Sequence, residues 1–193
     1  MDGRDALVAI GMNGEPLPLA HGFPARIIVP GLYGFVSATK WLTEIELTTF
    51  DVDHGRFPTD LAAFDGWVIS GSANSAYEDL PWIHQTEDLL RTLVTDQAPV
   101  VAVCFGRQLL AQALGGRVVL QPSGLRVGTV TTQLRQHAPW MQPAPAQITL
   151  YAAHEDQVLQ PAPGAQVLGG DAICPVACTA IGRQVFTTQC HPE

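Results

Sequence analysis

Long hydrophobic runs are missing from this chain of 193 residues. No apolar stretch reaches the roughly 18 residues that a membrane-spanning helix needs. The first residues mix acids and glycines with only a short apolar stretch, a pattern that argues against a secretory signal peptide. We therefore expect no membrane association and a cytoplasmic location.

Positive charge and cysteine are also scarce. Ten Lys and Arg residues face 18 Asp and Glu residues, and the net charge of −8 argues against nucleic acid and anionic membranes as partners. Four cysteines in a chain without a signal peptide argue against disulfides. Cys174 and Cys178, with His191 as a third candidate ligand, have no second matching pair. We expect structural thiols there and no metal site.

The sequence changes character near residue 50. Before this point, Pro and Gly divide the chain into short units, and β-rich segments predict strands at 6–10, 25–29 and 43–50. After it, apolar strand-like segments alternate with helical ones, which indicates βαβ units. We therefore expect a β-rich fragment over residues 1–50 and a separate domain over residues 51–193.

The second piece predicts an α/β fold. Helices are expected at 81–96 and 106–116, and strands at 66–70, 98–104, 117–120, 126–134, 146–151, 166–170 and 183–189. The early strands alternate with helices, so we expect a mainly parallel sheet flanked by helices. The later strands have few helices between them and predict an antiparallel or mixed extension.

Cys104 stands where a buried strand runs directly into a helix. Such a sharp turn exposes a side chain at the top of a sheet, and it needs small neighbours such as Ala102 and Gly106. The helix N-terminus favours a thiolate, and the backbone N–H of Phe105 would face a developing oxyanion. A buried structural cysteine is the alternative. Arg107 is expected to be solvated, or to favour the thiolate through its charge.

The last residues supply a candidate base. His191 and Glu193 are two residues apart just after a strand, and residues at that spacing in an extended chain face the same side. Glu193 could then accept a hydrogen bond from one ring nitrogen of His191 while the other faces Cys104. This order of nucleophile, base and orienting carboxylate is typical of acyl transfer.

These segments together resemble class I glutamine amidotransferases, most of all the stand-alone, GMP-synthase-like members. The resemblance rests on AFDGWVISGSANSAYEDLPWI, PVVAVCFGRQLLAQALGGRV, HEDQV and QCHPE, and it covers about residues 51–193. It implies a flavodoxin-like fold, a catalytic triad of Cys104, His191 and Glu193, and an oxyanion hole completed by the backbone N–H of Gly71.

The resemblance also implies substrate-binding residues. Gln108 matches the residue that helps to hold glutamine, and His154 and Asp156 match a motif beside the pocket. It implies glutamine or a γ-glutamyl compound as the substrate, an ammonia-accepting partner protein, and no cofactor.

The sequence departs from the family at both ends of the domain. The family's first βα unit is replaced by the β-rich N-terminal segment, of which residues 43–52 could serve as a sheet strand, and we expect the domain to be truncated after Glu193. Residues 5–50 resemble a fragment of the sulfite-oxidase-type molybdopterin oxidoreductases. His21, Arg26 and Lys40 match positions near the pterin phosphate, but this segment contains no residue that could hold molybdenum.

Four functions follow from these features. The first is hydrolysis of the glutamine side-chain amide through a γ-glutamyl thioester. The second is cleavage of a γ-glutamyl peptide by the same triad. The third is an inactive remnant or binding module, and the fourth is a molybdopterin-binding oxidoreductase fragment.

Overall fold

The computed structural model describes residues 7–9, 11–12, 15–16, 26–28, 46–141 and 145–192. The chain forms two compact units: one contains Met1–Thr49, Pro139–Ala144 and Pro192–Glu193, and the other contains Phe50–Ala138 and Pro145–His191. No helix in the described ranges has both the length and the apolar character needed to cross a membrane.

The first unit contains two short antiparallel pairs. β1 (Leu7–Ala9) pairs with β4 (Arg26–Ile28), and β2 (Gly11–Met12) pairs with β3 (Glu15–Pro16). The strands expected at 6–10 and 25–29 are therefore present. Each pair is a two-stranded sheet of its own, so neither strand takes the place of the family's first sheet strand. The candidate pterin contacts His21 and Lys40 lie outside the described residues.

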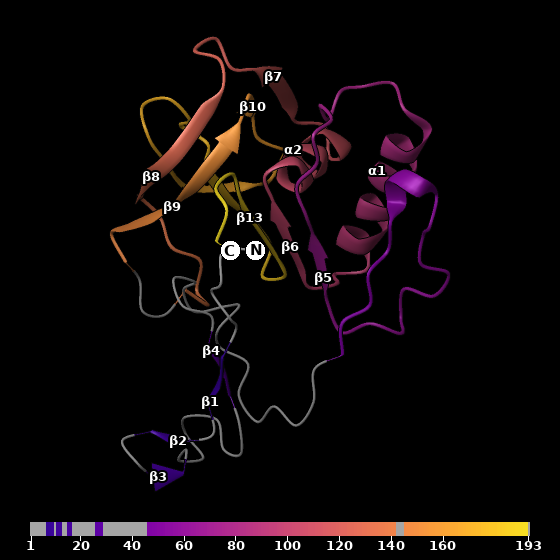
Figure 1. Cartoon of the computed structure of the whole chain (residues 1–193), viewed down its shortest axis with the longest axis horizontal. Helices are drawn as coiled ribbons and strands as arrows, with labels where there is room; N and C mark the ends of the chain where they lie inside the picture. Colours follow the sequence, from indigo (N-terminus) through magenta and orange to yellow (C-terminus); the bar gives the residue numbers. More distant parts are fainter. Residues whose placement is uncertain are drawn as a thin grey trace. The chain divides into compact units, whose positions relative to one another are not determined.

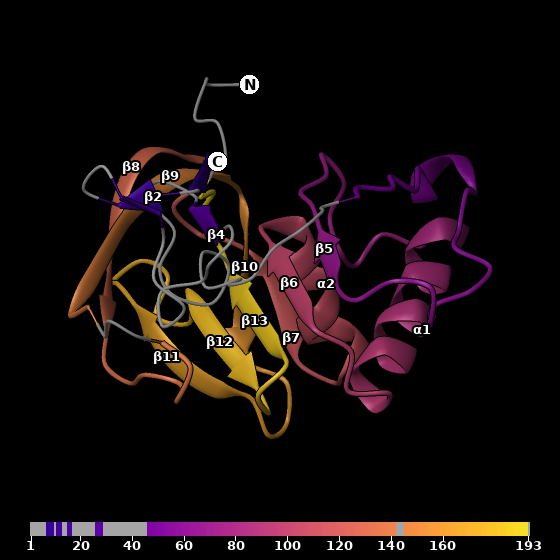
Figure 2. The same ribbon diagram turned by 90° about the horizontal axis from the view of Figure 1, so that it is seen from below.

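The second unit is built on a seven-stranded sheet of order β5-β6-β13-β12-β11-β8-β9 (Figures 1 and 2). Parallel pairing joins its first three strands, which are β5 (Trp67–Ile69), β6 (Val100–Val103) and β13 (Val185–Thr188). Antiparallel pairing adds the other four, which are β12 (Cys178–Ile181), β11 (Gln166–Gly170), β8 (Arg126–Leu134) and β9 (Gln147–His154). A separate antiparallel pair joins β7 (Arg117–Leu120) to β10 (Asp156–Gln160).

The expected α/β class is confirmed, and the antiparallel extension is larger than the sequence indicated. Parallel pairing is confined to β5, β6 and β13 because no helix in the described part of the chain connects the strands from β8 onward. Parallel neighbours need a long crossover, whereas antiparallel neighbours need only a turn. β10 and β12 were not predicted, because their short segments lack a clear apolar pattern.

The prediction of a strand at 43–50 is wrong for the described residues of this range, 46–50. Residues 46–50 form no strand, and the side chain of Leu47 is 89% exposed. The β-branched composition suits a strand, but a strand is stable only with a hydrogen-bonded neighbour and a buried face. Residues 46–50 have neither.

Two helices carry the core of the second unit. α1 (Pro81–Thr95) begins with Pro81 at its first turn and buries Ile83, Leu90 and Leu93. α2 (Phe105–Ala113) follows β6 and packs against α1, β6, β7 and β10. Contacts on so many sides bury every residue from 105 to 111, so the expectation of a solvated Arg107 is wrong. The helix that begins at the candidate nucleophile is thus fixed on all sides.

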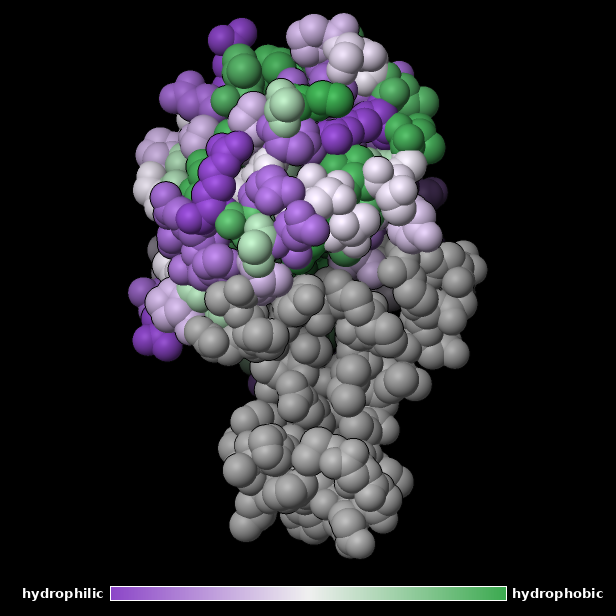
Figure 3. All heavy atoms as spheres, turned by 90° about the vertical axis from the view of Figure 1, so that its left-hand side faces the viewer, coloured by the Kyte–Doolittle hydropathy of each residue, from purple (hydrophilic) through white to green (hydrophobic). Residues whose placement is uncertain are grey.

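The side of the second unit that carries β8 and β9 shows hydrophilic and hydrophobic residues interspersed (Figure 3). Along β8, exposed and buried or half-buried residues alternate, as expected for a strand with one solvated face. The buried residues Val130 and Leu150 pack with Ala152 and Cys190 in a small cluster of their own. Cys190, a member of this cluster, directly precedes the candidate base His191 in the sequence.

Candidate active site

Cys104 occupies the sharp turn that the sequence indicated. It joins β6 to α2 with φ of 52° and ψ of −110°, a backbone conformation that is costly for a residue with a side chain. The turn is held from both neighbouring strands. The N–H of Cys104 donates to Thr188 at 2.9 Å, and the N–H of Gly106 donates to Ser70 at 3.1 Å. Strain that surrounding strands enforce in this way is typical of functional sites.

Gly106 is required at its position. A Cβ atom there would lie 2.5 Å from the backbone oxygen of Ile69 and 2.7 Å from its Cγ2 atom. Both distances are well inside van der Waals contact, and the nearer atom belongs to the backbone of β5. The expectation that the turn needs a small residue two positions after Cys104 is confirmed.

Three segments that are distant in sequence meet at Cys104. A Cβ atom on Gly71, which follows β5, would lie 3.5 Å from Cε1 of His191 and 3.8 Å from Cβ of Cys104. His191, which follows β13, is anchored by its N–H, which donates to the carbonyl oxygen of Tyr151 at 2.7 Å. The structure therefore brings Cys104, His191 and Gly71 together. Cys104 is 6% exposed, so the thiol lies just beneath the surface.

Two backbone N–H groups near Cys104 have no backbone partner in the described part of the chain, and their role as oxyanion donors stays a prediction. Among the described residues, no backbone hydrogen bond engages the N–H of Gly71 or that of Phe105. Phe105 is the first residue of α2, where N–H groups have no partner within the helix. Its ring packs on Trp82 with 5.6 Å between the centroids, which fixes this end of the helix.

Gln108 lies on α2 one turn after Cys104 and is 3% exposed. Its Nε2 donates to the carbonyl oxygen of Asp156 at 2.9 Å and approaches Oε1 of Gln189 at 3.4 Å. These contacts connect α2 to β10 and to the strand end before His191. A substrate contact for Gln108 stays a prediction.

His154 and Asp156 stand where β9 passes into β10. Nδ1 of His154 lies 3.0 Å from the backbone oxygen of Asp156, while Nε2 is buried without a partner among the described residues. Burial lowers the pKa of His154, which favours the neutral form of its imidazole. The carboxylate of Asp156 accepts a hydrogen bond from the Tyr77 hydroxyl at 3.0 Å. The adjoining carbonyl of Ala153 lies 3.9 Å from the sulfur of Cys104, so this corner borders the nucleophile.

Two residues complete the comparison of the site with the prediction. Glu193, the third member of the expected triad, is outside the described residues. Gln189 was missed, although its Nε2 lies 3.7 Å from the sulfur of Cys104 and its side chain is fully buried. Its only signal in the sequence is its place at the end of β13, two residues before His191. Glutamine in such a position is ordinary, so composition could not find it.

The four cysteines are free and buried. Burial raises the pKa of Cys178 to about 11 and that of Cys190 to about 12, and it also raises the pKa of Cys174. These three thiols stay protonated at neutral pH. No group of three metal-binding side chains occurs in the described ranges.

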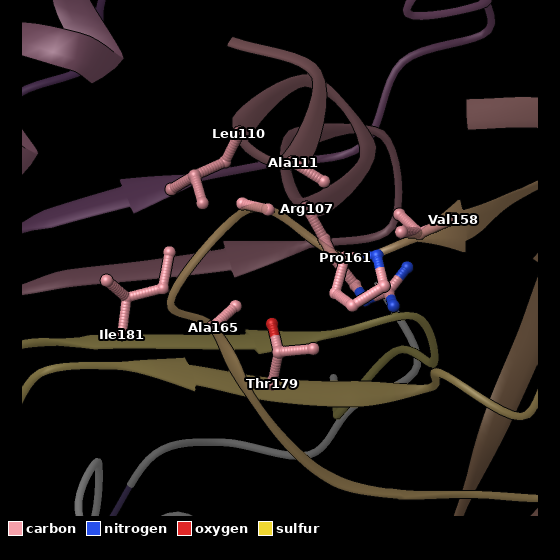
Figure 4. A pocket seen from close by; sticks show the side chains of 9 residues that line it. Arg107, Leu110, Ala111, Val158, Pro161, Ala165, Thr179 and Ile181 are labelled. Atoms are coloured by element: carbon pink, nitrogen blue, oxygen red, sulfur yellow. The ribbon is translucent and has the colours of Figure 1, made fainter. Parts of the chain in front are cut away.

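A small cavity lies beside α2, away from the candidate site. It has a volume of about 10 Å³, and Arg107, Pro161 and Thr179 are among its lining residues (Figure 4). That is room for about one water molecule. Cys104 and His191 do not line it, so it is not the place where a substrate would meet the nucleophile.

Two family profiles match this chain. The sequence profile described as "Glutamine amidotransferase class-I" matches residues 38–193. The chain belongs to the class I glutamine amidotransferase family. The profile described as "Oxidoreductase molybdopterin binding domain" matches residues 1–55, as the N-terminal resemblance indicated.

The curated relatives of this amidotransferase-family chain include γ-glutamyl peptidases and GMP synthases. It is 32% identical to Gamma-glutamyl peptidase 4 of Arabidopsis thaliana over 75% of this chain and 61% of that protein. It is 30% identical to the GMP synthase [glutamine-hydrolyzing] of Streptococcus mutans over 66% of this chain and 24% of that protein. The chain thus spans about three fifths of the peptidase's length and a quarter of the synthase's.

Solved structures support the same fold. A glutamine amidotransferase from Thermotoga maritima superposes with a TM-score of 0.69 at 20% identity, covering 74% of this chain and 62% of that one. At this identity the likeness establishes the fold alone. The flavodoxin-like architecture implied by the resemblance is confirmed.

Proposed function

We propose that this chain hydrolyses the side-chain amide of glutamine, with Cys104 as the nucleophile. The observation that carries the proposal is the convergence of Cys104, in a strained strand-to-helix turn, with His191 and Gly71. Membership in the amidotransferase family supports it. A thiol, an imidazole and free backbone donors within one small region are what acyl transfer needs.

The reaction would run in two steps. Cys104 gives its proton to His191 and attacks the carbonyl carbon of the amide, and the N–H groups of Gly71 and Phe105 stabilise the oxyanion. His191 then protonates the amide nitrogen, the C–N bond breaks, and ammonia leaves behind a γ-glutamyl thioester. In the second step His191 takes a proton from water, the hydroxide attacks the thioester, and glutamate departs as the proton returns to the sulfur.

Other residues have supporting roles in this proposal. Glu193 orients His191, and Gln108, His154 and Asp156 contact the substrate. The ammonia would pass to an acceptor on a partner protein, and we place the reaction in the cytoplasm, where four free thiols are stable.

Cleavage of γ-glutamyl peptides is the second candidate. It uses the same steps with an amine as the leaving group in place of ammonia, and the similarity to the Arabidopsis γ-glutamyl peptidases favours it. The two candidates are separated by comparing ammonia release from glutamine with the cleavage of glutathione-like peptides by the same protein.

The nucleophile is tested by a glutaminase assay on the wild type, Cys104→Ala and Cys178→Ala. Cys178 is a matched control because it is also a buried thiol, but its raised pKa keeps it protonated. We expect Cys104→Ala to lose activity by a factor on the order of a thousand or more, and Cys178→Ala to retain it. Equal rates in wild type and Cys104→Ala would contradict the proposal.

Absence of activity on both substrates would instead favour an inactive remnant or binding module. An electrophilic glutamine analogue distinguishes this alternative, because labelling of Cys104 requires a formed site. A molybdopterin-binding fragment is tested separately by metal analysis of the purified chain, in which we expect no molybdenum.

A further inference from the structure

A buried arginine lies one turn behind the nucleophile. Arg107 is 1% exposed, and Figure 4 shows its side chain leaving α2 toward the neighbouring strands. Its Nη1 donates to Oε1 of Gln189 at 3.0 Å, and its Nη2 donates to the carbonyl oxygen of Val176. Among the described residues, no Asp or Glu pairs with it, and its Nε has no partner. A buried cation without a carboxylate partner is costly to the fold and calls for explanation.

The contact with Arg107 fixes how the amide of Gln189 is turned. A guanidinium has donors only, so the atom of Gln189 that faces Arg107 must be the oxygen. Nε2 of Gln108 approaches the same oxygen at 3.4 Å, which supports that orientation. The NH₂ group of Gln189 therefore points the other way, and it lies 3.7 Å from the sulfur of Cys104.

The sulfur of Cys104 thus has one donor and one acceptor beside it. As a thiol it donates weakly to the carbonyl of Ala153 at 3.9 Å, and as a thiolate it accepts from Gln189. The acceptor favours the thiol and the donor favours the thiolate. Arg107 polarises the amide of Gln189, which makes its N–H a stronger donor because hydrogen-bonded chains strengthen one another.

We propose that Gln189 is a positioning residue. Its amide, polarised by the positive charge of Arg107, donates a hydrogen bond that stabilises the reactive thiolate of Cys104. The inference rests on the proposed function for its purpose, but it is tested on the sulfur alone. The titratable groups near this sulfur are His191, His154 and Asp156, and the thiols of Cys174, Cys178 and Cys190 lie near Arg107.

The decisive variant is Gln189→Glu. Glutamate has nearly the same shape and accepts hydrogen bonds from Arg107 and Gln108, so we expect the fold to survive. It removes the N–H donor and places a negative charge beside the sulfur. Gln189→Met removes the donor without adding charge. Gln133→Glu is the control, because Gln133 is exposed on β8 and, among the described side chains, bonds only to Gln147.

The measurement is the rate of iodoacetamide alkylation against pH, with each modified cysteine identified by peptide mass spectrometry. We expect the midpoint for Cys104 to move up by about one pH unit or more in Gln189→Glu, which slows alkylation at neutral pH about tenfold. Gln189→Met should shift it less in the same direction, and Gln133→Glu should match the wild type.

Three results would overturn the inference. They are an unchanged midpoint in folded Gln189→Glu, an equal shift in Gln133→Glu, and a wild-type chain in which Cys104 is not alkylated between pH 5 and 9. Circular dichroism and urea unfolding establish that each variant is folded, and Gln189→Met decides the matter if Gln189→Glu is not. Since alkylation needs no glutamine, a wild type without glutaminase activity would refute the proposed function and leave this test intact.

Discussion

The two ends of the candidate site are held in different ways. Cys104 is fixed by local constraints: a positive φ, a glycine two residues later that touches the backbone of β5, and a helix buried on all sides. The contacts of His191 include a backbone hydrogen bond to Tyr151, which lies far away in sequence on β9, and its neighbour Cys190 is packed in a buried cluster. Changes at the first end should therefore cost stability and activity together, whereas changes at the second should separate them.

Replacing His191 by Asn gives the largest expected effect on catalysis. The backbone N–H that bonds to Tyr151 is kept, so the loss in free energy of unfolding should stay at or below the typical effect of a point substitution, about 1 kcal/mol. The general base is lost, so kcat on glutamine or a γ-glutamyl peptide should fall by a factor of about 100 to 10,000. Urea unfolding and steady-state kinetics measure the two quantities. A large loss of stability with activity retained would contradict the contrast between the ends.

Gly106→Ala should damage both properties. The new Cβ atom would lie 2.5 Å from the backbone oxygen of Ile69, and relief requires β5 or the start of α2 to move. We expect the free energy of unfolding to fall by about 1–3 kcal/mol, with a marked loss of activity because Cys104 is displaced.

Gly66→Ala is the control for that change. Its Cβ atom would meet Pro99 at 3.5 Å, an ordinary contact, and Gly66 directly precedes the same strand β5. We expect stability and activity close to those of the wild type. If Gly106→Ala were as stable as Gly66→Ala, the turn would be far less constrained than its geometry indicates.

The difference between the ends also explains what the sequence could predict. Cys104, Gly106 and Phe105 lie within three residues of one another, so a strand-to-helix pattern was enough to place them. The helices and the strand β8 follow from periodicity and length in the same local way. The pairing of His191 with Tyr151 depends on how β9 and β13 fold back, which no short segment encodes.

Arg107 and Gln189 show the same limit of local reasoning. Arginine on a helix is usually exposed, and only the packing of α2 against four other elements buries this one. The contact of Gln189 with Cys104 joins positions 85 residues apart. The resemblance to the amidotransferases placed Gly71 and His191 together, but it gave no reason to expect the buried arginine.

Alkaline pH gives the smallest expected effect, which is a loss of folding stability at the His191 end. Burial raises the pKa of Cys190 to about 12 and that of Cys178 to about 11, from an ordinary value of 9.0. A raised pKa means that the folded chain holds its thiol protons more tightly than the unfolded chain. Their contribution to stability is therefore complete below about pH 9 and is lost as the pH rises toward 12.

Urea unfolding at a series of alkaline pH values measures this loss. We expect the free energy of unfolding of the wild type to fall with pH over that window, and Cys190→Ala to fall less steeply, most clearly above pH 11, where Cys178 has already titrated. Because Cys190 packs with Val130 and Leu150 next to the anchored His191, its ionisation should loosen this end while the turn at Cys104 stays intact. A pH dependence identical in Cys190→Ala and wild type would show that this thiol does not hold the His191 end.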